Sequence, residues 1–273
     1  MIESSMNGAS MPQGRVDRLS ALIDRFRISA CVLGTALPAG EPAHLLLTGD
    51  GSLGETEPLA LRRLVFRVDG TREACRLQGP VAVAARVDLG GPGSPLATAL
   101  PEEVCIDLAE APALAAVAAV LHEEVTSPRC GGKAIVDRLC EIVVIRFLRH
   151  AIETGQARDG LIAGLGHPQI MLALVAMHEA PERRWRLEDL ASVCGMSRTA
   201  FATGFRRIVG QTPGAYLQAW RLCLARQEIE RGGVLKSVAG RVGFSSASAF
   251  SRAYSRQFGQ PPSGHARVGF SSA

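Results

Sequence analysis

The chain has no apolar run long enough to span a membrane, and its first residues lack the basic stretch and apolar segment of a secretory signal. Both absences disfavour a membrane or exported protein, so a cytoplasmic location is predicted. Residues 1–15 contain few large apolar side chains, and we expect them to be a disordered lead before a fold that starts near Val16.

Cysteine and histidine are present but not in disulfide or metal-binding patterns. None of the seven cysteines forms a CxxC pair, and their odd number argues for reduced thiols. Of the six histidines, only His44 falls within residues 17–108, so a clustered histidine site has no ligands there. No metal and no cofactor is predicted.

Charge is distributed unevenly along the chain. Residues 1–181 carry 16 Lys and Arg against 21 Asp and Glu, a net −5, whereas residues 182–273 carry 14 against 5, a net +9. A basic last third joined to a mildly acidic body predicts a module that binds a polyanion, attached to a module with another role.

The length of 273 residues and a change of pattern along the chain predict two domains. From about 28 to 108, five short apolar runs alternate with Gly- and Pro-rich turns, which predicts a small antiparallel barrel or sandwich. The runs are ISACVLG, AHLLLTG, RRLVFRV, VAVAARV and EEVCIDL. From Pro112 the spacing becomes helical, and the wide apolar face of the helix expected over 133–155 predicts a homodimer.

Two internal repeats are present. The stretch RVGFSSA occurs at 241–247 and again at 267–273. A more diverged repeat relates segments 191–213 and 239–262, with matches at an offset of 48 up to the turn and of 49 beyond it. The matched pairs are Ala191 and Ala239, Gly195 and Gly243, Ser197 and Ser245, Phe201 and Phe250, Phe205 and Tyr254, and Pro213 and Pro262.

Each copy of the diverged repeat has the layout of a helix-turn-helix. A short helix ends at a glycine, Gly195 or Gly243, which suits a left-handed turn. Ser197 or Ser245 is then a candidate N-cap for a second helix with aromatic residues at i and i+4 on its inner face. The segment between the copies predicts one rigid helix that sets the two second helices about one turn of DNA apart.

At this point the sequence resembles the AraC-type family of bacterial transcription regulators, over about residues 167–267. The resemblance is carried by RLEDLASVCGMSRTAFATGFRRIVGQTPGAYLQAWRLCLAR and VAGRVGFSSASAFSRAYSRQFGQPP. The preceding part is similar to the cupin-type effector domain of one branch of the family, in SPRCGGKAIVDRLCEIVVIRFLR and GLIAGLGHPQIMLALVAMHEAPERRW.

The resemblance implies an α+β chain of two domains. A cupin-like β-barrel with trailing helices is expected over 16–158, a linker over 159–166 and a tail over 268–273. An all-α domain of two helix-turn-helix units joined by a long helix is expected over 167–267. Double-stranded DNA and RNA polymerase are the implied partners, and the chain is expected not to be an enzyme.

The resemblance also assigns DNA reading to the second helix of each unit, at about 198–208 and 246–257. The family often has arginine where this chain has Thr203 and Gly204, which reduces the guanine readout expected from the first unit. Arg252 suits a bidentate guanine contact and Arg256 a phosphate. The full set of predicted DNA contacts is Ser197, Arg198, Thr199, Thr203, Arg206, Arg207, Ser246, Ser248, Ser251, Arg252 and Arg256.

Two hypotheses describe the signal received by the effector domain. Either a small molecule binds the barrel, or an oxidant modifies a cysteine, with Cys31, Cys75 and Cys130 as candidates. Cys130 precedes an expected helix start, where the pKa of a thiol is lowered. Each of these thiols also suits an ordinary packing role.

Functions of other classes find less support. A catalytic cupin lacks clustered ligands, and a DNA-repair enzyme with this helical domain would need a Pro-Cys-His methyl-transfer motif, which is absent. A protein that has lost DNA binding stays open because Gly204 weakens its helix. No helix-forming segment follows the second RVGFSSA copy, so residues 268–273 are expected not to contribute to DNA affinity.

Overall fold

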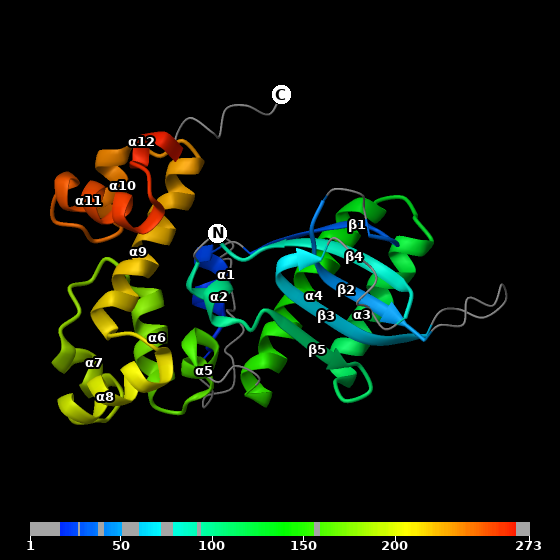
Figure 1. The fold of residues 1–273 in the computed structure, drawn as a ribbon, viewed down its shortest axis with the longest axis horizontal. Coiled ribbons are helices and arrows are strands. Elements are labelled where there is room, and N and C mark those ends of the chain that lie inside the picture. The colour runs from blue at the N-terminus through cyan, green and yellow to red at the C-terminus, as the bar shows by residue number, and fades with distance from the viewer. Residues whose placement is uncertain are drawn as a thin grey trace, which may run out of the picture.

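The protein is described by a computed structural model covering residues 17–26, 28–37, 41–50, 60–71, 79–91, 94–155 and 159–265. A sheet with two long helices forms one half, and a group of shorter helices around a long one forms the other (Figure 1). The predicted lead over 1–15, the predicted tail over 268–273 and Cys75 lie outside the described residues.

The five apolar runs form five strands of one antiparallel sheet, in the order β1-β4-β2-β3-β5. This confirms the predicted domain of short antiparallel strands, and β1 and β5 occupy the two edges of the described sheet. The strands are β1 (Ser29–Gly34), β2 (Ala43–Gly49), β3 (Leu61–Thr71), β4 (Val81–Asp88) and β5 (Glu103–Asp107).

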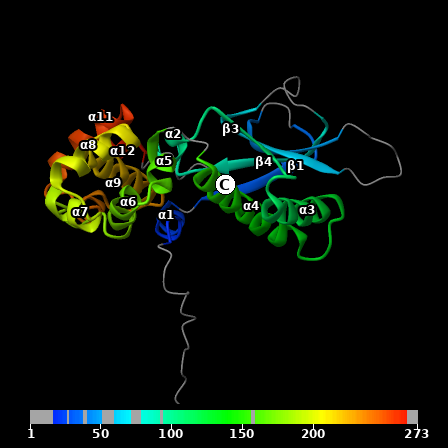
Figure 2. The ribbon, with the colours of Figure 1, turned by 90° about the horizontal axis from the view of Figure 1, so that it is seen from below.

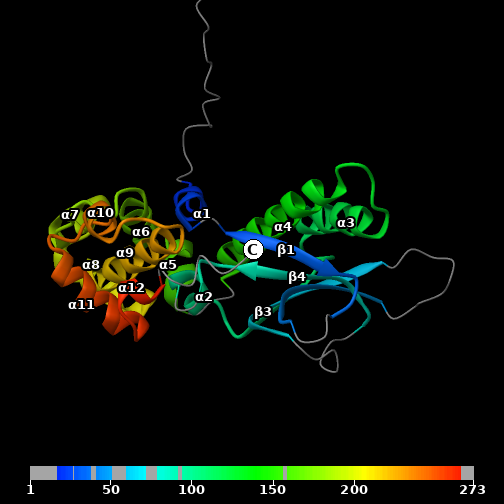
Figure 3. The same ribbon diagram turned by 90° about the horizontal axis from the view of Figure 1, so that it is seen from above.

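Alternation along the strands decides which side chains face the helices. Leu45 and Leu47 of β2 join the main core, whereas Leu46 between them belongs to a small cluster on the other face. Helices α3 (Pro112–Thr126) and α4 (Gly132–Thr154) cover one face of the sheet (Figures 2 and 3). Phe66 of β3 stacks on Phe147 of α4 with ring centroids 4.8 Å apart.

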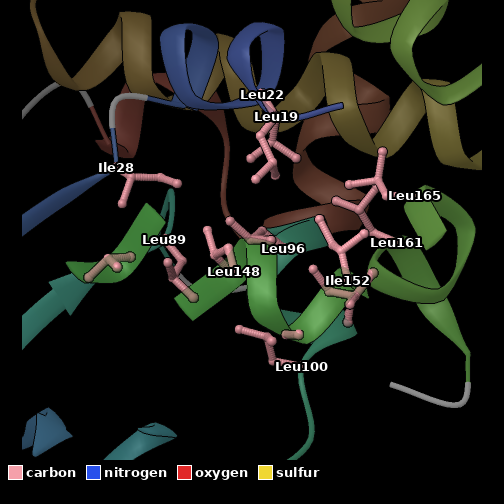
Figure 4. Packing of buried hydrophobic residues seen from close by; sticks show 14 of the residues in the cluster. Leu19, Leu22, Ile28, Leu89, Leu96, Leu100, Leu148, Ile152, Leu161 and Leu165 are labelled. Atoms are coloured by element: carbon pink, nitrogen blue, oxygen red, sulfur yellow. The ribbon is translucent and has the colours of Figure 1, made fainter. Parts of the chain in front are cut away.

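Three short helices, which we call the junction helices, lie between the two halves (Figure 1). They are α1 (Ser20–Phe26), α2 (Pro95–Ala99) and α5 (Gly160–Gly166). Helix α1 packs on α6 and α9 of the helical half, and α2 packs on α5 and α9. Figure 4 shows their apolar side chains, among them Leu22, Leu96 and Leu161, directed toward a shared core with Leu148 of α4.

The segment predicted as a linker, 159–166, therefore contains a packed helix. Leu161, Ile162 and Leu165 of α5 are each at most 2% exposed. Their burial against α2, α6 and α8 outweighs the low helix propensity of the glycines in GLIAGLG.

The helical half is organised around α9 (Pro213–Glu230), which confirms the predicted connecting helix. One group of helices lies at one end of α9 and another at its far end (Figure 1). The first group is α6 (Ile170–Glu179), α7 (Leu187–Val193) and α8 (Arg198–Val209); the second is α10 (Leu235–Arg241), α11 (Ala247–Phe258) and α12 (Pro262–His265).

Within the described ranges, no single helix is both long enough and apolar enough to cross a membrane. The pair α5 and α6, bent by 113°, passes the same test of length and composition only when taken together.

Candidate nucleic-acid interface

Two structurally matched helix-turn-helix units lie at the ends of α9. We call α7 with α8 the first unit and α10 with α11 the second unit. In each, a glycine with positive φ ends the short helix, at +62° for Gly195 and +85° for Gly243. A Cβ atom raises the energy of this backbone region, so glycine suits both turns. The predicted left-handed turns are confirmed.

Serine caps start the outer helices α8 and α11. The hydroxyl of Ser197 accepts a hydrogen bond from the amide of Ala200, and that of Ser246 accepts one from Ala249, at 3.3 and 3.2 Å. The predicted cap Ser245 is therefore wrong: Ser246 is the cap, one residue later. Ser197 matches Ser246 at an offset of 49, so the extra residue of the second unit lies within its turn.

Aromatic side chains hold the inner faces of α8 and α11. Phe201 and Phe205 on α8, like Phe250 and Tyr254 on α11, are at most 1% exposed. Each pair meets edge to face, with centroids 5.6 and 5.4 Å apart. This packing fixes which side of each helix faces solvent.

The outer faces carry all eleven residues predicted to contact DNA, and every one of them is exposed. Arg198 forms an ion pair with Glu188 of α7 at 3.1 Å; both side chains are more than half exposed, so the pair contributes little stability. Hydroxyls and guanidinium groups on a protruding helix can donate to phosphates and base edges. The exposed residues are Ser197, Arg198, Thr199, Thr203, Arg206, Arg207, Ser246, Ser248, Ser251, Arg252 and Arg256.

Gly204 does not interrupt α8, which continues to Val209. A Cβ at this position would lie 3.8 Å from Cε of Met196 and 3.9 Å from Cδ1 of Ile170, an ordinary contact distance. The missing side chain leaves room in a cavity of about 300 Å³ whose rim includes Thr203 and Arg207. The first unit therefore keeps its helix but presents a hollow beside its outer face.

Arg221 of α9 joins the two units, a role that sequence reasoning missed. Its Nε donates to the carbonyl of Pro181 at 2.6 Å and its Nη2 to that of Arg183 at 2.8 Å, both in the loop before α7. Its Nη1 donates to the carbonyl of Gly243 in the turn of the second unit at 3.3 Å. One guanidinium thus holds the loop before the first unit close to the turn of the second unit.

A buried histidine lies beneath the first unit. His178 of α6 shares a 2.6 Å hydrogen bond with the hydroxyl of Tyr216 and stacks on Trp220, with centroids 4.0 Å apart. Burial lowers the pKa of His178 to about 3 and raises that of Tyr216 well above its usual value, so both are neutral near pH 7. This is a structural core rather than a proton-transfer site.

The sheet domain contains a cavity of about 420 Å³ at the end nearest the junction helices. Asp69, Asp88 and Thr98 of α2 are the polar residues among those that line it. The space has room for a small molecule with an apolar body and a polar end. Its apolar lining comes from Phe66, Val68, Val87, Leu89 and Ala97.

The candidate redox cysteines are partly placed by the structure. Cys31 on β1 and Cys130 before α4 are exposed, and Cys105 on β5 is exposed as well. Partial burial raises the pKa of the Cys105 thiol, which disfavours its reactive thiolate form. Across the described parts of the chain, no three His, Cys, Asp or Glu side chains come together as a metal site would require.

Two family models match the chain, a helix-turn-helix domain over residues 190–267 and a cupin over residues 35–153. The HTH-type transcriptional regulator AlkR of Acinetobacter baylyi is 42% identical over 133 residues, which cover 48% of this chain and 44% of that protein. A putative AraC-like transcription regulator of Streptomyces lividans is 36% identical over 144 residues, covering 52% and 47%. The chain thus spans less than half the length of these two relatives.

Among solved structures, a transcriptional regulator from Chromobacterium violaceum, described as having an AraC-type DNA-binding domain, is 25% identical. The match covers 39% of this chain and 96% of that one, with a TM-score of 0.37.

Proposed function

We propose that this chain, which belongs to the AraC-type family of transcription regulators and carries a cupin-type domain, binds double-stranded DNA sequence-specifically and regulates transcription. The observation that carries the proposal is the pair of matched units on one helix. Both present a serine-capped helix with an exposed face of hydroxyls and arginines. Two such helices suit successive major-groove segments.

The exposed residues divide by chemistry into positioning and reading groups. Ser197, Arg198, Arg206, Arg207 and Arg256 suit phosphate oxygens, which fix the register of the protein on the duplex. Thr199 and Thr203 in the first unit, with Ser246, Ser248, Ser251 and Arg252 in the second, face the base edges. Arg252 is the one with a planar fork for guanine.

The domain that receives the signal is the cupin-type part, over about 16–158, and the DNA-binding part extends over about 167–267. The cavity beside Asp88 supports a small-molecule signal, since apolar residues and the polar residues Asp69, Asp88 and Thr98 line it together. An oxidant acting on Cys31 or Cys130 is the second candidate, supported by the exposure of both residues.

A second copy of the chain and RNA polymerase complete the proposed set of partners, acting in the cytoplasm. Three apolar side chains on the outer surface of α3 and α4 support a homodimer: Val120 is 48% exposed, and Ile135 and Ile142 are each 42% exposed. RNA polymerase is implied by the family. Analytical sedimentation at micromolar concentration measures the oligomeric state, and a monomer at that concentration would contradict the proposed homodimer.

The test of DNA binding starts with a pool of random duplexes from which the full chain selects its target. Gel mobility shift on the selected duplex should then show that Arg252→Ala costs about 1–3 kcal/mol and relaxes specificity at one base pair. Arg138→Ala on α4 is the control, because it removes the same charge from an exposed site in the other domain. Failure to enrich any sequence would contradict the proposed function.

A further inference from the structure

Arg226 is a buried arginine in the connecting helix α9, with 5% of its surface exposed. A guanidinium is costly to bury unless its donors and charge are matched. The contacts of Arg226 run in two directions, toward the cupin-type domain and toward the second unit.

Toward the cupin-type domain, Nη2 of Arg226 donates to the carbonyl of Gly90 at 3.2 Å. The turn that presents this carbonyl follows β4 and is held by Asp88, whose Oδ1 accepts hydrogen bonds from the amides of Gly90 and Gly91 at 2.9 and 2.6 Å. Both glycines have positive φ. A Cβ at Gly91 would collide with Nη2 of Arg226, so a glycine is needed for this close approach.

Toward the second unit, the guanidinium lies over the ring of Phe258, 5.1 Å from its centroid. Phe258 is the last residue of α11, and its ring packs edge to face on Tyr254 one turn earlier. The Nε of Arg226 also lies 3.3 Å from a carboxylate oxygen of Glu230 on the same helix. Arg226 therefore touches the inner face of the helix that carries Arg252.

We propose that Arg226 is a positioning residue through which the Asp88–Gly91 turn of the cupin-type domain fixes the angle of α11 on α9. The inference rests on the proposed DNA binding, because the angle matters only if α8 and α11 contact one duplex together. Asp88, Leu89 and Gly91 of this turn also line the cavity of about 420 Å³ in the cupin-type domain. A compound bound in that cavity therefore acts on α11 through Arg226.

The primary test is Gly91→Ala, a change in the cupin-type domain with no part in the DNA surface. Its matched control is Gly131→Ala, because Gly131 has nearly the same φ, +79° against +78°, but a Cβ there meets nothing within 4 Å. Both variants place an alanine at nearly the same positive φ, and Gly91→Ala alone disturbs Arg226.

The readout is binding of the full chain to the duplex it selects from a random pool and to the same duplex with one base pair inserted between the two contacted segments. We expect Gly91→Ala to bind the selected duplex roughly fivefold or more weakly, because α11 is no longer preorganised. The preference for the selected spacing should also shrink. Gly131→Ala should stay within about twofold of the parent chain in both measurements. Equal behaviour of the two variants would overturn the inference.

A second variant keeps the test decisive if Gly91→Ala fails to fold, which its thermal melting curve reveals. Arg226→Lys retains the charge but replaces the fork by a single ammonium, so it should weaken spacing selectivity in the same way. Where Gly91→Ala folds, the double variant should bind the duplex no more weakly than the weaker-binding single variant, because both changes break the same contact. Additive losses would contradict the coupling. If the parent chain selects no duplex, the proposed function fails instead.

Discussion

The two helix-turn-helix units have the same backbone plan but different outer surfaces. At the position where the second unit has Arg252, the first has Thr203, and the small residue that follows is Ala253 in one and Gly204 in the other. Conversely, Arg206 of the first unit corresponds to Ser255 of the second. The first unit is thus better suited to holding phosphates, and the second to reading a guanine.

The units also differ in how they are supported from inside. The first unit rests on α5 and α6 and on the stacked pair His178 and Trp220, continuous with the junction core. The second unit packs against the end of α9, and its described ties to the rest of the chain include the side chains of Arg221 and Arg226. The first unit is thus anchored to the rest of the chain and the second is more independent. Because both lie on α9, the angle between them can change.

The largest expected difference concerns stability. Phe201→Ala and Phe250→Ala empty matched buried positions, and each should cost about 3–5 kcal/mol of packing. Loss of Phe201 should lower the urea midpoint of the whole helical half, whereas loss of Phe250 should open α10 and α11 locally. Hydrogen exchange resolved by residue distinguishes the two outcomes. Equal exchange in the two units of both variants would show that the units unfold as one.

A second expected difference between the two units is how their stability depends on pH. The pKa of His178 falls from 6.5 to about 3 on folding, so the unfolded chain binds the extra proton and stability declines as pH drops below 6.5. The free energy of unfolding should be about 2 kcal/mol lower at pH 5 than at pH 7 from this group. Urea titrations at both pH values measure it.

The comparison with His178→Gln isolates this group, because glutamine stays neutral at both pH values. The acid-dependent loss should shrink by the same amount in the variant. Residues 235–264, which include the second unit, contain no histidine. No group of this kind within the second unit should therefore make hydrogen exchange in α11 depend on pH. An unchanged pH slope in His178→Gln would contradict the buried neutral state.

The smallest effects concern the helix caps. Ser197→Ala and Ser246→Ala should each cost about 1 kcal/mol, because each removes the acceptor for an amide in the first turn. Ser245→Ala should remain within about 0.5 kcal/mol of the parent, since its neighbour provides the cap. Thermal melting of the three variants is sufficient. A larger loss of stability in Ser245→Ala than in Ser246→Ala would show that Ser245 is the cap, which matches Ser197 at an offset of 48.

Local pattern predicted much of this molecule. Five apolar runs became five strands, and the paired glycines marked both turns. The cap of α11 was misplaced because Ser245 and Ser246 are equally able to cap, and only the backbone path selects between them. The hydrogen bonds of Arg221 and Arg226 to backbone carbonyls join residues 22 to 136 positions apart, and no local spacing encodes them.

The packed helix within 159–166 is a second feature that local sequence pattern did not predict. Its glycines favour a loop, and only the surrounding α2, α6 and α8 make a helix the better way to bury Leu161 and Leu165. The eleven predicted contact residues were chosen from the family resemblance and from the outward positions of each second helix. All eleven are exposed, whereas their contacts with DNA remain a prediction.

The position of α1 has a consequence for synthesis on the ribosome. Helix α1 is made early, yet the surfaces it packs against belong to α6 and α9, which are made at least 140 residues later. Leu22, fully buried in the finished molecule, therefore stays partly uncovered until α6 and α9 have been translated. Closing so long a loop also slows the last step of folding. The sheet half can thus form first and keep part of its apolar edge exposed until the helical half has been made.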